Sequence, residues 1–215
     1  MRSRTKSKGF TLLEMTMAVT ITAIIGLAVA GATIALSRAY QDTEEFYQSL
    51  QTARSAMLRI QRTVQGSKLI TACPGTILVL WVDDTNGNGN INADEVLVLV
   101  FDTAAQEVRL CRKVFPDALK PALNVEVPLY DLIDANAVLS NVSGSAYVQT
   151  IVLANDTTDF YATASPAPPL AKRVDLYLSV GTDKNVMALR SAATTRGPKT
   201  AQVQVVDSQY VLVPD

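Results

Sequence analysis

The sequence predicts an α+β protein in which one long N-terminal helix is followed by an antiparallel β-sheet domain. Residues 10–66 contain no proline, and in the second half of that stretch apolar side chains recur at three- and four-residue steps. After Gly66 the chain changes to short segments rich in Val, Leu and Ile, which are typical of strands. Because the helical segment precedes the strands instead of alternating with them, an α+β architecture is expected.

The composition argues against most kinds of catalytic or nucleic-acid-binding protein. The 215 residues contain no histidine, the commonest general base and transition-metal ligand. A zinc enzyme or a Ser-His-Asp hydrolase is therefore not expected, and no organic cofactor is predicted. The formal net charge of −1 provides no bulk basic field for nucleic acid. We therefore do not expect an enzyme.

The N-terminus has the charge pattern of a membrane-spanning segment. Residues 1–9 contain four basic and no acidic side chains, and residues 15–37 contain no charged side chain. A helix of roughly 20 residues is long enough to cross a bilayer. The basic start predicts that the N-terminus stays in the cytoplasm and that the rest of the chain lies outside. A secretory signal fits less well, because the apolar run is too long and lacks an Ala-x-Ala-like site at its outer end.

Glu14 lies at the edge of this apolar segment and is the one charged residue between positions 10 and 37. A carboxylate at such a position costs on the order of a few kcal/mol on insertion, so a partner is expected. No positively charged group of the same chain can reach it from inside the membrane. This predicts that the partner comes from another molecule, which a plain membrane anchor does not explain.

The residues Gly9-Phe10-Thr11-Leu12-Leu13-Glu14 follow a basic leader and precede a long apolar run. This arrangement resembles the processing and assembly motif of type IV pilins and type II secretion pseudopilins. The resemblance implies cleavage between Gly9 and Phe10 by a prepilin peptidase, followed by N-methylation of Phe10. It also implies that Glu14, the fifth residue of the mature chain, pairs with the N-terminal amine of a neighbouring subunit.

The helical pattern continues beyond the apolar segment. One apolar face is formed by Tyr47, Leu50, Ala53, Met57, Ile60 and Val64. We expect one helix of about 55 residues, on the order of 80 Å long, although two helices with a break near residues 37–41 stay open. The predicted segments are a cleaved leader, a membrane and assembly helix, an amphipathic continuation of the helix, and a β-rich domain outside the membrane, at residues 1–9, 10–37, 38–66 and 67–215.

The β-rich domain is predicted from short apolar runs and from alternation of apolar and polar residues. Strands are expected at residues 68–72, 76–82, 95–101, 107–111, 124–128, 147–153, 173–180 and 185–193, a short helix at 131–141, an extended proline-rich connector at 165–169, and a further β-prone stretch at 202–213.

The size of the chain and the order of its elements are most similar to J-type minor pseudopilins of type II secretion and to related minor pilins. That resemblance implies a single-pass inner-membrane protein that is incorporated into a type IV pilus-like or type II secretion filament. The implied partners are other pilin subunits, the prepilin peptidase and an inner-membrane assembly platform.

Two alternative functions stay open, a competence-type pilin that captures DNA and a membrane-anchored binding module. The modest basic cluster of Arg190, Arg196 and Lys199 does not favour DNA.

Residues 84–95, DTNGNGNINADE, match the calcium-loop pattern D-x-[DN]-x-[DN]-G-x5-E. The predicted ligands are Asp84, Asn86, Asn88, Asn90 through its backbone carbonyl, Asn92 and Glu95. The expected flanking elements are strands and not helices, and Asn stands where Asp is allowed at three positions. The spacing therefore predicts a weak structural Ca²⁺ site, with a dissociation constant on the order of 10⁻⁴–10⁻³ M. The alternative is a polar hairpin loop in which Asn-Gly pairs supply positive φ angles.

Cys73 and Cys111 end two predicted strands in the domain outside the membrane, where disulfides persist. A disulfide between them is favoured over two free thiols. Asn155, Asp156 and Asp159 are expected to lie in a solvated loop and not to hold an ion.

Overall fold

The structure, a computed structural model, describes residues 11–181, 186–196, 199–207 and 209–213. Its first element is the single helix α1 (Leu12–Gly66), so the prediction of one uninterrupted helix is confirmed over these residues. The chain divides into two compact units, and the boundary between them lies within α1, between Tyr47 and Gln48. The C-terminal part of α1 therefore belongs to the same unit as the strands.

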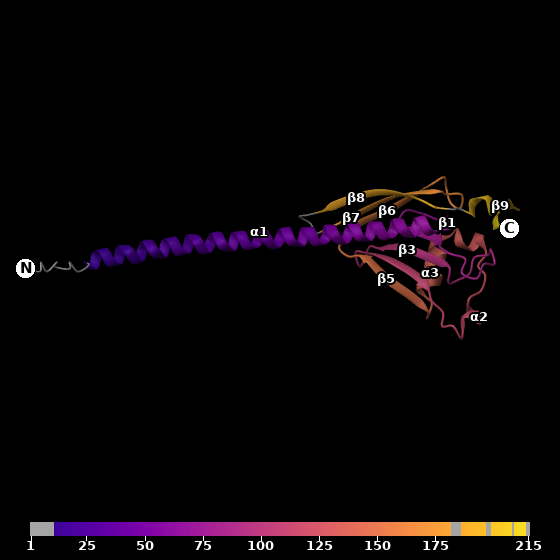
Figure 1. Ribbon diagram of the computed structural model, residues 1–215, viewed down its shortest axis with the longest axis horizontal. Coiled ribbons are helices and arrows are strands. Elements are labelled where there is room, and N and C mark those ends of the chain that lie inside the picture. The colour runs from indigo at the N-terminus through magenta and orange to yellow at the C-terminus, as the bar shows by residue number, and fades with distance from the viewer. Residues whose placement is uncertain (1–10, 182–185, 197–198, 208, 214–215) are drawn as a thin grey trace, which may run out of the picture. The chain divides into compact units, whose positions relative to one another are not determined.

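The unit that begins at Gln48 contains a five-stranded antiparallel meander and a separate three-stranded antiparallel sheet (Figure 1). The first sheet consists, in spatial order, of β1 (Leu69–Ala72), β2 (Ile77–Trp81), β3 (Val96–Asp102), β4 (Glu107–Lys113) and β5 (Val148–Ala154). The second sheet consists of β6 (Thr157–Ser165), β7 (Arg173–Val180) and β8 (Met187–Thr194).

Short helices and a hairpin complete this unit. They are α2 (Lys120–Leu123), the 3-10 helices η1 (Leu129–Leu132) and η2 (Lys199–Gln202), α3 (Ala135–Ser143), and the paired strands β9 (Val203–Val206) and β10 (Gln209–Leu212). Asp134 caps α3, because its carboxylate accepts hydrogen bonds from the backbone N–H groups of Asn136 and Ala137 at 3.0 and 3.2 Å.

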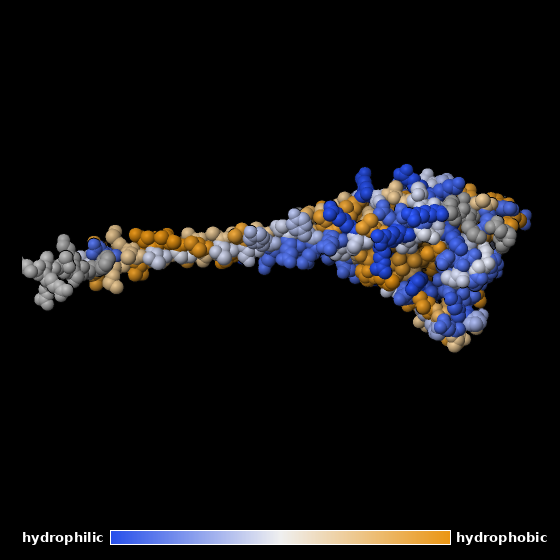
Figure 2. All heavy atoms as spheres, in the orientation of Figure 1, coloured by the Kyte–Doolittle hydropathy of each residue, from blue (hydrophilic) through white to orange (hydrophobic). Residues whose placement is uncertain are grey.

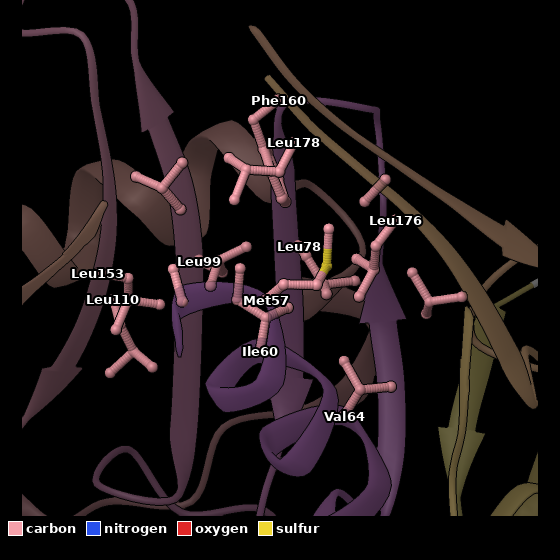
Figure 3. Close-up of a cluster of buried hydrophobic side chains, with 14 of the residues drawn as sticks. Met57, Ile60, Val64, Leu78, Leu99, Leu110, Leu153, Phe160, Leu176 and Leu178 are labelled. Atoms are coloured by element: carbon pink, nitrogen blue, oxygen red, sulfur yellow. The ribbon is translucent and has the colours of Figure 1, made fainter. Parts of the chain in front are cut away.

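The larger core joins the C-terminal part of α1 to both sheets. Met57, Ile60 and Val64 extend from α1 among apolar side chains of the two sheets (Figure 3). The labelled strand residues in that view are Leu78, Leu99, Leu110, Leu153, Phe160, Leu176 and Leu178. Because the helix residues repeat at three- and four-residue steps, one face of α1 fills the space between the sheets.

A second core covers the other face of the five-stranded sheet. There Leu69, Val79 and Trp81 pack with residues of η1 and α3, and with Tyr210 of the β9–β10 hairpin. This arrangement explains why β2 is apolar at every position. Its alternate residues face different cores, and all five are buried.

The structure corrects two expectations about the strands. The segment 124–128 is not a strand, since its pairing is limited to one isolated bridge between Asn92 and Glu126. Conversely, β6 occupies residues that were expected to form a loop and the start of the connector. Asp159 therefore lies within a strand, while Asp156 adopts a φ of 50° in the turn between β5 and β6. The antiparallel strands are divided between two sheets and a hairpin.

Candidate functional site

The described chain opens with a capping box at the start of α1. Thr11 precedes the helix, and its hydroxyl oxygen accepts a hydrogen bond from the backbone N–H of Glu14 at 3.3 Å. In return, Glu14 Oε2 accepts hydrogen bonds from the backbone N–H and the hydroxyl of Thr11, at 2.9 and 3.0 Å. These reciprocal bonds satisfy backbone donors that a helix leaves unpaired at its N-terminus.

The structure gives Glu14 a neutral hydrogen-bond partner within its own chain, which sequence reasoning missed, while a positively charged partner from another molecule stays a prediction. The partner within the chain is Thr11, which donates two hydrogen bonds to the carboxylate but carries no positive charge. The sequence signal was present as Thr-x-x-Glu directly before an apolar helical run. Gly9 and Phe10, the predicted processing residues, lie outside the described residues.

The N-terminal part of α1 presents apolar side chains on its surface. Leu12, Leu27 and Ile34 are more than half exposed, and Figure 2 shows hydrophobic residues along this part of the helix. More hydrophilic residues follow further along α1. By length and composition, α1 is able to cross a membrane.

The predicted calcium loop connects β2 to β3 and forms a compact set of turns. Asn86 Oδ1 accepts a hydrogen bond from the backbone N–H of Asn88 at 3.0 Å, and Asn88 Oδ1 accepts one from Asn90 at 2.9 Å. The amide nitrogens of Asn86 and Asn88 both donate to Asn92 Oδ1 at 3.3 Å. The structure therefore brings these three amide groups together.

The carboxylate of Glu95 accepts hydrogen bonds from residues near both ends of this loop. The side chain is buried, and its Oε1 accepts hydrogen bonds from the backbone N–H and hydroxyl of Thr85 at 2.7 and 3.0 Å. Its Oε2 accepts hydrogen bonds from the indole N–H of Trp81 at 3.2 Å and from the backbone N–H of Asn92 at 3.1 Å. Sequence reasoning missed Trp81 and Thr85, which the fold brings to this carboxylate.

Replacing Glu95 with alanine is expected to lower the free energy of unfolding by about 1–3 kcal/mol, because several donors lose their acceptor in a buried place. Chemical denaturation monitored by tryptophan fluorescence measures the change. Glu126→Ala, which removes an exposed carboxylate near the same loop, is the control and is expected to change stability by less than about 0.5 kcal/mol. Equal stability of the two variants would contradict this role of Glu95.

The loop contains few carboxylates. Among the residues that the structure describes, no group of three or more His, Cys, Asp or Glu side chains is arranged to hold a metal ion. Asp84 and Glu95 are the acidic members of the predicted ligand set, and the others are asparagines. A cation here would therefore depend mainly on neutral oxygen ligands.

The disulfide favoured by the sequence is not formed in this structure. Cys73 and Cys111 are both free thiols. Cys73 packs against the core between the sheets and donates to the carbonyl of Ala162 at 3.3 Å, while Cys111 lies in the second core beside Thr150. Burial raises the pKa of the Cys73 thiol, which makes it a poor nucleophile.

Comparison with known proteins adds one finding about the N-terminus. Residues 4–30 match the family model described as the prokaryotic N-terminal methylation motif. No curated protein and no solved structure gave a match. The matched residues include Gly9, Phe10 and Glu14 and residues 15–30 of the apolar segment. The chain thus carries a prepilin-type N-terminus, which supports the type IV pilin and type II secretion pseudopilin family.

Proposed function

We propose that this protein is a minor pilin or pseudopilin subunit of a type IV pilus-like or type II secretion filament. The observation that carries the proposal is the exposed apolar surface of α1 immediately after a prepilin-type motif. Exposed apolar side chains in such number need a bilayer or other apolar helices around them. The membrane supplies this environment before assembly, and the neighbouring helices of a filament supply it afterwards.

In this proposal assembly depends on the N-terminus. Cleavage between Gly9 and Phe10 frees the amine of Phe10, and Glu14 of one subunit pairs with that amine on a neighbour. The described hydrogen bonds of Glu14 use Oε2, so Oε1 can accept the incoming amine while the capping box stays intact. A charge-assisted contact in an apolar environment is stronger than the same contact in water.

The proposed partners are a prepilin peptidase, an inner-membrane assembly platform and other pilin subunits. The N-terminus faces the cytoplasm, and the unit with the two sheets lies outside the membrane, as the basic residues of the leader suggest. The role is structural, and a J-type position in a secretion filament is the subtype that we favour.

Coproduction with a prepilin peptidase tests this function. We expect mass spectrometry of the membrane fraction to show a mature chain that starts at Phe10 and carries one N-terminal methyl group. Gly9→Leu should leave the leader attached, whereas Ser7→Ala, a change within the same leader, should be processed like the wild type. A mature N-terminus at any other residue would overturn the proposal.

A DNA-capturing pilin is the competing function, and the charges of the described residues do not favour it. Several cations are paired with acids. Arg109 contacts Asp102 and Glu107 at 2.7 and 2.8 Å, and Arg173 contacts Asp175 at 2.6 Å. We expect no salt-sensitive retention of DNA by the protein. Retention that falls steeply between low and physiological salt would instead favour the competing function.

A further inference from the structure

Asp84 has a buried carboxylate oxygen without a partner. The side chain is 7% exposed, and its Oδ2 accepts a hydrogen bond from the backbone N–H of Gly89 at 3.1 Å. Its Oδ1 is buried and has no hydrogen-bond partner. Leaving a charged oxygen in this state is costly, so such an atom in a native fold calls for an ion or a water.

The carboxylate of Asp84 closes the turn formed by residues 84–89, because its Oδ2 accepts a hydrogen bond from the backbone N–H of Gly89. The unpartnered Oδ1 is the other oxygen of this same buried group. The amides of Asn86, Asn88 and Asn92 meet within hydrogen-bond distance at the same turn. Asn92 Oδ1 already faces the other two amides, and the Oδ1 atoms of Asn86 and Asn88, which each accept one backbone hydrogen bond, keep a second lone pair for a cation.

We propose that the loop 84–95 binds Ca²⁺. The protein ligands are Oδ1 of Asp84, the amide oxygens of Asn86, Asn88 and Asn92, and the backbone carbonyl of Asn90. Waters complete the six to eight oxygens that Ca²⁺ takes, and its tolerance of irregular geometry suits a loop of amides better than the strict octahedron of Mg²⁺. This inference does not depend on the proposed function.

The structure changes the role predicted for Glu95. Four hydrogen bonds from Thr85, Trp81 and Asn92 already occupy its carboxylate, so it anchors the loop and contributes charge without ligating the ion directly.

A lysine side chain competes with Ca²⁺ for the carboxylates, since Lys68 Nζ lies 3.8 Å from Asp84 Oδ2 and 3.7 Å from Asp83 Oδ1. The low net charge at the site keeps the affinity weak, with a dissociation constant on the order of 10⁻⁴–10⁻³ M.

The bound ion would stiffen a junction of several segments. Backbone hydrogen bonds connect the loop to the segment after α2, from Val127 to Ile91 at 2.8 Å and from Ala93 to Val125 at 3.1 Å. Lys120 of α2 forms an ion pair with Asp94 at 2.8 Å. An ion bound between β2 and β3 would therefore also stabilise the hydrogen bonds and the ion pair that hold the segment 120–127 to the loop.

The chain provides its own probe for the test. Trp81, the only tryptophan, donates to Glu95 at the end of the loop and is fully buried. Full-length protein in detergent is titrated with Tb³⁺, and emission sensitised by Trp81 is followed while Ca²⁺ displaces it. We expect saturable emission that Ca²⁺ removes at concentrations on the order of 10⁻⁴–10⁻³ M. Absence of emission that Ca²⁺ can displace would overturn the proposal.

Two matched variants identify the ligand. Asp84→Asn should weaken Ca²⁺ binding by at least about tenfold, because it removes the charged ligand. Asp83→Asn removes the adjacent carboxylate, whose side chain is 70% exposed and contacts the same lysine, and should change affinity by less than about twofold. If both variants lose the same Ca²⁺ affinity, the ion is attracted only by the general negative charge of this region, and the proposed site is wrong.

A third variant is expected to bind Ca²⁺ more tightly, a result that a folding defect does not produce. Asn88→Asp adds a carboxylate where calcium loops accept one, and should tighten Ca²⁺ binding by at least about threefold. An unchanged or weaker affinity in a folded Asn88→Asp protein would contradict the proposed ligand set.

Discussion

Replacing Glu14 with glutamine is expected to reduce incorporation of the protein into filaments by at least about tenfold, while cleavage and membrane insertion continue. Removing one partner of a buried ion pair costs about 3–5 kcal/mol, because the other charge is left uncompensated. Glutamine keeps an oxygen that accepts from Thr11, and capping boxes use Glu or Gln at this position, so the start of α1 is preserved. The substitution therefore isolates the contribution of the charge.

Immunoblots of sheared filaments and of membranes measure this effect. Glu44→Gln is the matched control, since it also removes one exposed carboxylate from α1. The control should enter filaments at the wild-type level. If Glu14→Gln also does so, the proposed pairing with a neighbouring amine has no role in assembly.

The second large effect is expected at Ile60, in the centre of the core between the two sheets. This side chain is 1% exposed and packs with residues from both sheets. Ile60→Ala removes buried methyl groups and leaves a cavity, and should lower the free energy of unfolding by about 2–5 kcal/mol. The loss should appear as a lower denaturation midpoint, with an unchanged dependence on denaturant.

Leu58→Ala provides the comparison on the same helix. Leu58 is 53% exposed, so its truncation removes little buried surface, and alanine has the higher helix propensity. Stability should change by less than about 0.5 kcal/mol. Trp81 fluorescence reports both unfolding transitions. A similar loss for Leu58→Ala and Ile60→Ala would show that α1 is not packed between the sheets as described.

The helix and most strands could be predicted because their signals are local. The absence of proline and the three- and four-residue spacing around Ile60 were sufficient for α1. The strand β6 was missed because its inward positions include the small residues Ala162 and Ala164, which weaken the period-two signal. The division into two sheets was not predictable, because it depends on pairing between distant segments such as β4 and β5.

In the candidate sites too, features set by local spacing could be predicted, whereas contacts between distant segments could not. The positions of Glu14 and of the loop follow from spacing, whereas the backbone hydrogen bonds that Asn86 and Asn88 accept within the loop were not predicted. The four donors around Glu95 depend on how β2 and the loop meet in space. Likewise, the equal placement of Cys73 and Cys111 at strand ends gave no sign that they belong to different cores.

A chemical cross-link within purified filaments tests directly whether Glu14 contacts the N-terminal amine of a neighbouring subunit. A hydrophobic carbodiimide activates carboxylates in apolar surroundings and joins them to an amine within contact distance. Filaments are assembled from mixed isotope-labelled subunits, so that peptides that join two chains are distinguished from those within one. We expect a peptide that links Glu14 to the N-terminal amine of a neighbouring mature subunit. Filaments in which Glu14 reacts without linking to an amine, or in which this chain still begins at Met1, would contradict this expectation.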